Sequence, residues 1–389
     1  MTGTIRQNDY QQQNDCQQQS TYQQQNDYQR QNDCQQQSTC QRQNELRTCW
    51  ERAHGITVGL AAELPPGFSV GFAQDKNSAT GCTVVICEQG AVAGVSVLGA
   101  APATRETDLL RSENMVERIH ALVLSGGSAF GLDAAGGVMR LLEKRGVGIS
   151  FGGRRIPIVV GASLFDLEVG DDSAAPDLDM GYAAASEADR TLKVGNVGAG
   201  LGASVGKILG MDFCMKGGMG ASTIIQDDLI LTALVAVNAL GCIFDPVTGS
   251  FVAGVLDPQT IQNEIQNEIQ NDHPTILDPY HALAILAGAD FVREAKRSNT
   301  TIGCILTNAD LTKTQANRIA ATTHDGYARA ITPIHTSFDG DAIFCLSAGQ
   351  VIVHPDVLGS LAALCMERAV INAVIEAQSA YGIRAACDL

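Results

Sequence analysis

Residues 296–308 read Lys-Arg-Ser-Asn-Thr-Thr-Ile-Gly-Cys-Ile-Leu-Thr-Asn and place an Asn-Thr-Thr step directly before an apolar run. The run from Ile302 to Leu306 predicts a buried β-strand, because it is short and rich in branched side chains. Threonine at the beginning of a strand is ordinary, since its branched side chain suits a pleated surface. On this stretch alone, a structural role for Thr300 is therefore the simpler interpretation.

Two other stretches favour a catalytic interpretation. Residues 195–207 (Gly-Asn-Val-Gly-Ala-Gly-Leu-Gly-Ala-Ser-Val-Gly-Lys) place Lys207 after a run of glycines. Residues 335–344 (His-Thr-Ser-Phe-Asp-Gly-Asp-Ala-Ile-Phe) place Asp339 and Asp341 on a tight turn before another apolar run. A hydroxyl, an amine, glycine-lined backbone and paired carboxylates are the parts of a nucleophilic amidase. Taken alone, Asp-Gly-Asp is more typical of a hairpin turn.

Together these stretches resemble the self-processing serine/threonine aminopeptidases of peptidase family S58. This family includes the L-aminopeptidase/D-esterases, the β-peptidyl aminopeptidases and the nylon-oligomer hydrolases. The resemblance runs from about Gly55 to Ile383 and also takes in residues 121–132, 216–220 and 233–238. It implies an α/β fold of the ornithine acetyltransferase type, a four-layer α/β/β/α sandwich with two central sheets. Our own interpretation agrees, because predicted strands alternate with predicted helices. A homo-oligomer, a tetramer of αβ units, is also implied.

The resemblance further implies that the chain cuts itself between Asn299 and Thr300. The hydroxyl of Thr300 would attack the carbonyl of Asn299, and water would then release a new N-terminus at Thr300. The products would be residues 1–299 (the α chain) and 300–389 (the β chain). An N-terminal threonine carries its own base, since its α-amine has a reference pKa of roughly 7.7–8.0.

Four further residues receive roles by the same resemblance. Lys207 would lie beside the nucleophile and relay its proton. Asn238 would stabilise the oxyanion, a contribution of typically about 10²–10³ in rate per donor. Asp339 and Asp341 would hold the new amine or orient Lys207 through charge-assisted bonds. The resemblance implies neither a metal nor an organic cofactor.

The turn after the apolar run 119–124 is a candidate substrate-binding loop. Gly126, Gly127 and Ser128 lie where a strand enters a helix, and backbone N–H groups at such a junction can hold a carboxylate or an oxyanion. A packing turn is the equal alternative. Ser128 does not satisfy the nucleophile-elbow pattern Gly-x-Ser-x-Gly, because Phe130 occupies the last position.

Other interpretations of the polar residues are weaker. The glycine run matches a dinucleotide fingerprint without a βαβ unit around it, and it fails the phosphate-loop pattern at Leu201 and Ile208. His324 and His335 remain alternatives for a catalytic base. The sequence contains no His-Glu-x-x-His and no Cys-x-x-Cys, so a metal site is not expected.

The composition excludes some classes of protein. The 389 residues include 26 basic and 42 acidic ones, and the net charge of −16 argues against a nucleic-acid partner. No secretory signal is visible, and no run approaches the roughly 18 uncharged apolar residues of a membrane helix. Twelve cysteines are scattered, mostly in apolar segments, as expected for free thiols in a reducing compartment. We expect a cytoplasmic protein that binds no membrane.

Two regions are expected along the chain. Residues 1–50 form a Gln/Asn-rich repeat, predicted to be a disordered tail. Residues 51–389 form the predicted catalytic domain. Within it we expect a strand pair at 83–87 and 93–98, a helix opened by a capping box at residues 312–315, and a long helix at 355–379.

Three functions remain open. The first is an amidohydrolase that acts on small peptides, amides or esters. The second is an acyltransferase of the ornithine acetyltransferase type. The third is a non-catalytic protein that assembles through its Gln-rich tail. The sequence does not identify the substrate, because several specificities share these motifs.

Overall fold

The computed structural model describes residues 57–59, 64–266, 274–287 and 299–389. These residues belong to one compact unit, Ile56–Leu389. The predicted tail, residues 1–50, lies outside the described residues, as does the segment directly before Asn299.

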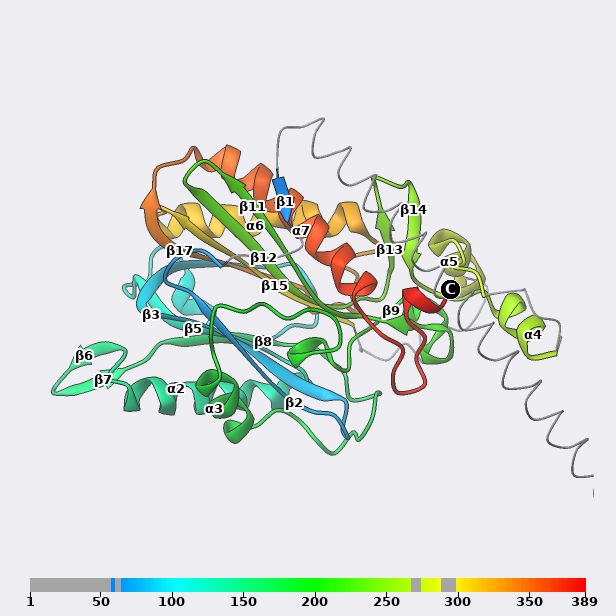
Figure 1. The fold of residues 1–389 in the computed structure, drawn as a ribbon, viewed down its shortest axis with the longest axis horizontal. Coiled ribbons are helices and arrows are strands. Elements are labelled where there is room, and N and C mark those ends of the chain that lie inside the picture. Colours follow the sequence, from blue (N-terminus) through cyan, green and yellow to red (C-terminus); the bar gives the residue numbers. More distant parts are fainter. Residues whose placement is uncertain (1–56, 60–63, 267–273, 288–298) are drawn as a thin grey trace, which may run out of the picture. The chain divides into compact units, whose positions relative to one another are not determined.

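A ten-stranded mixed sheet forms the centre of this unit (Figure 1). The strands that follow one another along it are β1 (Thr57–Gly59), β11 (Gly218–Gln226), β12 (Leu229–Asn238), β15 (Thr300–Ala309), β17 (Ala342–Val351), β3 (Thr80–Val97), β5 (Arg118–Ser125), β8 (Val159–Ser163) and β4 (Ala103–Arg105), and β2 (Ser69–Asp75) pairs with β3. β15 is antiparallel to β12 and parallel to β17. The strand that carries the Asn-Thr-Thr step is therefore central, with a partner on each side.

The helices lie on the outside of the strands. Figure 1 shows α6 (Lys313–Ala330) and α7 (Pro355–Ile375) beside β11, β12, β15 and β17, while α2 (Ala134–Lys144) and α3 (Leu178–Ser186) lie beyond β2, β3 and β5. Two further helices, α4 (Pro258–Gln266) and α5 (Pro279–Ala287), lie near the C-terminal end of the chain. Helices α2 and α3 pack closely on each other through the small residues Gly137 and Gly181. The mixed α/β architecture with a central sheet is confirmed, and the four-layer order stays a prediction.

Short elements complete the described chain. Small sheets consist of β6 (Ile149–Phe151) with β7 (Arg154–Ile156), β9 (Ser204–Val205) with β10 (Met215–Lys216), and β13 (Cys242–Asp245) with β14 (Ser250–Ala253) and β16 (Ile331–Thr332). The 3-10 helices are η1 (Asp108–Leu110), η2 (Ser128–Asp133), η3 (Gly198–Gly200), η4 (Lys207–Leu209), η5 (Met211–Phe213) and η7 (Ala386–Asp388).

Separate apolar clusters hold the helices and the strands together. One joins β12, β15 and β17 to α6 and α7, with Tyr327 fully buried in it. Another joins β3 and β5 to α2 and α3. A third contains side chains of β3 and β5 together with side chains of β12, β15 and β17. All ten residues of β15 are buried, so this strand contributes to the core on both faces.

Several predicted elements are confirmed. The apolar run 302–306 lies inside β15. Thr312 and Gln315 form the predicted capping box of α6. Helix α7 is, within the described part of the chain, the one helix long and apolar enough to span a membrane. Because 83% of its apolar window is buried inside the protein, it is a core helix here.

The predicted strand pair at 83–87 and 93–98 is wrong. Residues 80–97 form the single strand β3. Gly90 has a positive φ of 80° and lies in a register shift between Ile86 and Ala91, so the chain bends locally without reversing. The first half of β3 pairs with β2 and its second half pairs with β17, and β5 bridges both halves.

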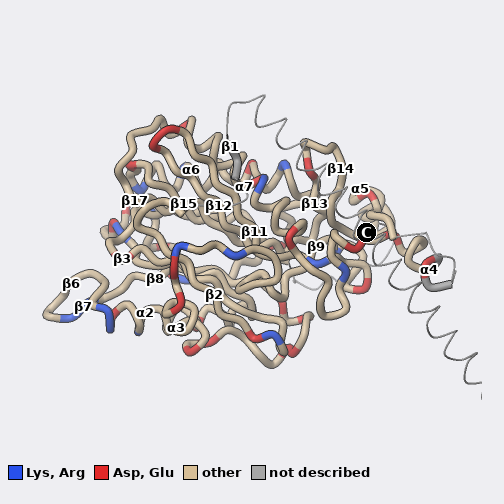
Figure 2. Tube along the Cα trace, viewed as in Figure 1, with Lys and Arg blue, Asp and Glu red and all other residues tan. Residues whose placement is uncertain are grey.

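Charged residues are distributed over many elements (Figure 2). The β6–β7 hairpin carries the basic pair Arg154 and Arg155, and Arg154 Nε lies 2.6 Å from a carboxylate oxygen of Glu143. All eight cysteines of the described residues are free, and seven of them are buried. Buried unpaired thiols agree with the expectation from the sequence.

Candidate active site

Thr300 is the first residue of β15 and lies opposite Asn238, the last residue of β12. The antiparallel register of these two strands fixes this pairing, because a slip of one residue would turn every side chain of β15 to the other face. Both side chains are buried: Thr300 is 4% exposed and Asn238 is 1% exposed. The structure therefore brings together two residues that are 62 positions apart in the sequence (300 minus 238).

The carbonyl of Asn299 accepts two hydrogen bonds at the start of β15. The hydroxyl of Thr300 donates to this oxygen over 2.5 Å, and the backbone N–H of Gly340 donates to it over 3.0 Å. Asn299 and Asp339 form an isolated parallel bridge, which sets the position of the Gly340 N–H. A Cβ on Gly340 would lie 2.9 Å from Thr300 Oγ1, so only glycine allows this approach. The peptide bond between Asn299 and Thr300 is thus flanked by a hydroxyl and by a backbone donor.

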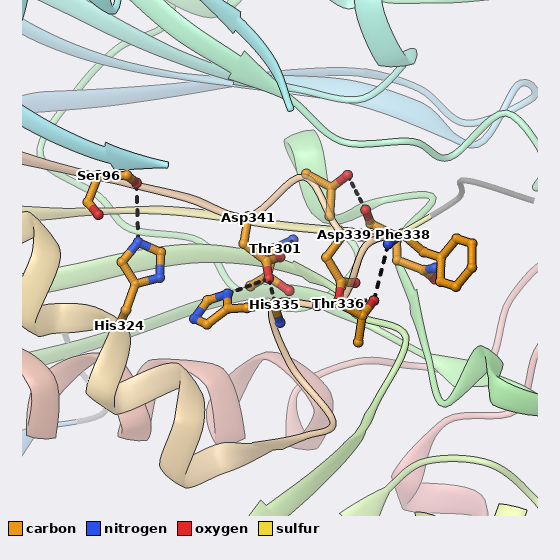
Figure 3. Close-up of polar contacts among 10 residues, drawn as sticks. Ser96, Thr301, His324, His335, Thr336, Phe338, Asp339 and Asp341 are labelled. Atoms are coloured by element: carbon orange, nitrogen blue, oxygen red, sulfur yellow. Dashed lines mark hydrogen bonds and ion pairs between the residues drawn. The ribbon is translucent and has the colours of Figure 1, made fainter. Parts of the chain in front are cut away.

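Asp341 holds the backbone directly after Thr300 (Figure 3). Its Oδ1 accepts the backbone N–H of Thr301 over 2.7 Å. Its Oδ2 accepts the ring Nδ1–H of His335 over 2.8 Å and the backbone N–H of His335 over 3.3 Å. Asp341 is completely buried, and these three donors compensate its lost hydration.

Asp339 is the second buried carboxylate of the turn. Its Oδ2 accepts the backbone N–H and the hydroxyl of Thr336, each over 2.7 Å. Its Oδ1 is buried and has no hydrogen-bond partner among the described residues. Burial first, and the nearby charge of Asp341 second, raise the pKa of Asp339 to about 6. A carboxylate of this kind is costly to bury, so its position here suggests a function.

Lys207 approaches the same place from the glycine run. Gly206 has a left-handed φ of 72°, and a Cβ there would lie 2.0 Å from the backbone of Gly254, so the turn into η4 requires glycine. Lys207 Nζ donates to the side-chain oxygen of Asn238 over 2.8 Å and to its carbonyl oxygen over 3.3 Å. Burial lowers the pKa of Lys207 to about 8, although nearby acidic groups oppose this shift.

The amide of Asn238 is fixed by its neighbours. Its Oδ1 also accepts the backbone N–H of Ser204 over 3.0 Å, and its Nδ2 donates to the carbonyl oxygen of Phe165 over 2.7 Å. Since Oδ1 accepts from Lys207 and Ser204, Nδ2 must be the group that faces Phe165. Asn238 therefore connects the lysine, the glycine run and the segment after β8.

The loop Gly126–Ser128 uses its backbone N–H groups inside the protein. Gly126 N donates to Gly81 O over 2.9 Å, and Ser128 N donates to Leu164 O over 2.8 Å. Gly127 N donates over 2.7 Å to the carboxylate of Asp166, a side chain that is only 3% exposed. The loop does hold a carboxylate, as expected for such N–H groups, but the carboxylate belongs to this chain. Any contact with a ligand here would have to involve other atoms of the loop.

Sequence reasoning missed a second buried lysine. Lys216 is fully buried, and its Nζ donates to the carbonyl oxygens of Ala203 over 2.6 Å, Gly217 over 3.2 Å and Gly200 over 3.4 Å. Burial lowers its pKa to about 7. These bonds hold the backbone of the glycine run that positions Lys207. The resemblance includes residues 216–220 but gives Lys216 no role, and its flanking residues Met215 and Gly217 do not by themselves indicate burial.

The structure thus brings five predicted residues to one place. Thr300 pairs with Asn238, which binds Lys207, and Asp339 and Asp341 contact the neighbours of Thr300, Asn299 and Thr301. The parallel pairing of β15 with β17 explains how the Asp-Gly-Asp turn reaches the start of β15. Within the described ranges, no group of three or more His, Cys, Asp or Glu side chains is placed to hold a metal ion.

Comparisons with known proteins identify the family of this chain. Peptidase family S58 matches residues 55–387. An uncharacterized aminopeptidase of Mycobacterium bovis is 38% identical over 348 residues, which cover 85% of this chain and 94% of that protein. A 6-aminohexanoate-oligomer endohydrolase of Kocuria sp. is 30% identical over 322 residues, which cover 79% of this chain and 84% of that protein.

Solved structures resemble the fold. A β-aminopeptidase of Burkholderia sp. superposes with a TM-score of 0.57 at 19% identity, over 84% of this chain and 91% of the other. An L-aminopeptidase D-Ala-esterase/amidase of Ochrobactrum anthropi, described as a variant of the Ntn hydrolase fold, gives a TM-score of 0.59 at 16% identity, over 85% and 92%. At these identities the likeness concerns the fold alone.

Proposed function

This chain belongs to peptidase family S58, and from that membership we propose that it is a self-processing amidohydrolase with Thr300 as its nucleophile. The coarser activity, hydrolysis of peptide or amide bonds, follows from the family. The observation that carries the finer proposal is the Asn299 carbonyl, which accepts the Thr300 hydroxyl over 2.5 Å and the Gly340 N–H over 3.0 Å. The hydroxyl therefore lies beside the carbonyl that it would attack, and the Gly340 N–H is already placed to stabilise negative charge on the same oxygen.

The first reaction would be the cut itself. Thr300 Oγ1 attacks the Asn299 carbonyl carbon and gives up its proton, and the C–N bond to Thr300 breaks as its nitrogen takes a proton. The peptide thereby becomes an ester between Asn299 and the Thr300 hydroxyl. Water then hydrolyses the ester, which frees the hydroxyl and leaves Thr300 as a new N-terminus. The Gly340 N–H would stabilise the oxyanion that develops on the Asn299 oxygen.

Lys207 would handle the proton in this step. Burial lowers its pKa to about 8, so a useful fraction of the amine is neutral near this pH and can accept a proton. Its Nζ lies on the side chain of Asn238, which is paired across the ladder with Thr300. Asn238 would place Lys207 and contribute an oxyanion donor for the later substrate reaction.

In the mature protein, the freed amine of Thr300 would act as the base of its own hydroxyl. The buried Asp339 and Asp341 would balance the positive charge that this amine carries when protonated. The same hydroxyl would then attack a substrate amide or ester, form an acyl-enzyme and pass the acyl group to water. We propose small peptides or linear amides as the substrates, by analogy with relatives named for aminopeptidase and oligomer-hydrolase activity.

Several broader properties belong to the same proposal. They are a catalytic domain over residues 51–389, a four-layer α/β/β/α order, assembly into a homo-oligomer and a cytoplasmic location. The Gly126–Ser128 loop remains a proposed boundary of the substrate site. Its backbone N–H groups are occupied by Gly81, Asp166 and Leu164, so its contribution would be shape.

The test is the intact mass of the purified protein under denaturing conditions, for the wild type and for Thr300→Ala. We expect the wild type to contain a fragment that starts at Thr300 and the variant to remain one chain. Thr300→Ser, which retains a hydroxyl, is the matched control and should still be cut. A folded wild type that stays uncut would reject the proposed nucleophile.

A further inference from the structure

His335 adopts a backbone conformation that its side chain disfavours. Its φ is +56°, in the left-handed region, which few residues other than glycine adopt, although histidine is found there more often than most. Such strain persists only where surrounding contacts require it, and it is often found at functional sites. The contacts of His335 therefore need an explanation beyond a turn.

The explanation lies in how His335 binds Asp341. This conformation directs both the backbone N–H and the ring Nδ1 of His335 at Oδ2 of Asp341, over 3.3 Å and 2.8 Å. A carboxylate can only accept, so Nδ1 is the protonated ring nitrogen. The other oxygen of Asp341 accepts the N–H of Thr301 over 2.7 Å. Figure 3 shows the resulting chain, which runs from the His335 ring through Asp341 to the residue after Thr300.

The far side of the His335 ring is packed and not paired. The ring of His324 meets it at 4.8 Å between centroids with an interplanar angle of 68°, and the ring of Tyr327 lies 6.3 Å away. His324 Nε2 lies 3.2 Å from Ser96 O, and burial lowers the pKa of His324 to about 4. The His324 ring that packs against His335 is therefore uncharged at physiological pH. Within the described residues, His335 Nε2 is buried without a hydrogen-bond partner. Asp341 is therefore the polar anchor of this ring.

We propose that His335 is a positioning residue for the self-cleavage reaction. Its hydrogen bonds hold the carboxylate of Asp341 in the orientation that accepts the Thr301 N–H. The backbone held in this way positions Thr300 Oγ1 beside the Asn299 carbonyl. The inference rests on the proposed nucleophile. It differs from the role of a general base, because the ring nitrogen that faces the site is occupied by Asp341 and acts as a donor.

The variants His335→Gly and His335→Asn test the side-chain contact with Asp341 separately from the positive φ of the backbone. Both tolerate a positive φ, so neither variant should disturb the turn. His335→Gly removes the side-chain donor. His335→Asn replaces it, since the asparagine Nδ2 takes the place of Nδ1 at the same number of bonds from the backbone. Asp227→Gly, at the exposed positive-φ position in the β11–β12 turn, is the matched backbone control.

The experiment follows the conversion of newly synthesised full-length chain to fragments by mass, with thermal unfolding of each variant measured in a Thr300→Ala background. We expect His335→Gly to remain folded, with an unfolding temperature lowered only modestly by the donor that Asp341 loses, but to cut itself roughly 10- to 100-fold more slowly, the range expected for a lost hydrogen bond to a charged group. His335→Asn should restore most of the rate, and Asp227→Gly should cut at the wild-type rate.

The outcomes are distinguishable. If His335→Gly cuts as fast as the wild type, or if His335→Asn is as slow as His335→Gly, the positioning role is wrong while the proposed nucleophile stands. If His335→Gly is slow and also unfolds at a much lower temperature with no rescue by asparagine, the role is structural only, and the inference is again wrong. A wild-type chain that never cuts would overturn the proposed function and this inference with it.

Discussion

Replacing Asp339 by asparagine should make the folded protein increasingly stable relative to the wild type as the pH rises. The pKa of this buried carboxyl is raised from 3.8 to about 6, by burial and then by Asp341. A shift of about two units corresponds to about 3 kcal/mol, at about 1.4 kcal/mol per unit. Well below about pH 4 both the folded and the unfolded chain hold this proton. As the pH rises toward 6, the unfolded chain ionises first, so the wild type loses about 3 kcal/mol of unfolding free energy.

The amide of the Asp339→Asn variant cannot ionise and escapes this loss. The difference in unfolding free energy between the variant and its parent should therefore rise by about 2–3 kcal/mol from about pH 4 to pH 7. An unpaired amide at the place of Oδ1 would cost about 1–3 kcal/mol, but equally at every pH. Only the change with pH therefore tests the reasoning.

The assay is urea unfolding at intervals of about one unit between roughly pH 4 and pH 7, the window in which the unfolded and then the folded carboxyl ionise. Both proteins carry Thr300→Ala, so that the chain stays intact and unfolds as one molecule. Asp228→Asn, a change at an exposed carboxylate in the β11–β12 turn, is the matched control. A difference that stays constant across this window would refute the view that Asp339 is held ionised at a cost. With Thr300 present, Asp339→Asn should also move the rise of the self-cleavage rate to lower pH, since it removes a negative charge that raises the pKa of Lys207.

Three further predictions concern neighbouring groups. Gly340→Ala should slow self-cleavage by about 100-fold, because its Cβ would lie 2.9 Å from Thr300 Oγ1 and 2.7 Å from Ala101 O. A time course of intact mass that matches the wild type would contradict this prediction. The self-cleavage rate of the wild type should rise as the pH passes about 8 and then reach a plateau, because the neutral amine of Lys207 accepts the proton. A rate that does not change with pH, or a Lys207→Arg variant that cuts itself at the wild-type rate, would exclude Lys207 as the base. Lys313→Met should lower the unfolding free energy by about 2–3 kcal/mol, because Lys313 Nζ donates to the carbonyl oxygens of Leu109, Asn114 and Val116 over 2.8–3.1 Å. The measurement is urea unfolding with Thr300→Ala present. A midpoint equal to that of the parent would show that water replaces the amine at little cost.

The strands and helices with strong local signals are predictable from the sequence. β12 and β15 are apolar enough to be identified as buried strands, and α6 begins at a capping box that needs only two residues, Thr312 and Gln315. Residues 80–97 are predicted wrongly because Gly90 is a turn signal, whereas three neighbouring strands hold both halves of β3 in one direction. Pairing between distant strands therefore overrides the local preference for a turn.

The candidate site is predictable as a set of residue types and not as a network. The contacts of Asn238 depend on the register of β12 against β15, which no local pattern reveals. Lys216 looks like any lysine in the sequence, and only its burial among carbonyl oxygens identifies it as an anchor. The N–H groups of the Gly126–Ser128 loop are taken up by Asp166 and by two backbone carbonyls, partners that lie between 36 positions (164 minus 128) and 45 positions (126 minus 81) away.

The central position of β15 also makes self-cleavage depend on how far each molecule has folded. Asn299 meets the Gly340 N–H only after β15 has joined β12 on one side and β17 on the other. An incompletely folded chain lacks this geometry and should not be cut. The cut would then act as a record of correct folding: in any preparation, the uncut fraction would count the molecules whose central strand never reached its place. Once cut, a molecule that unfolds would have to find its other half by diffusion, so the same bond that activates the protein would also make its unfolding hard to reverse.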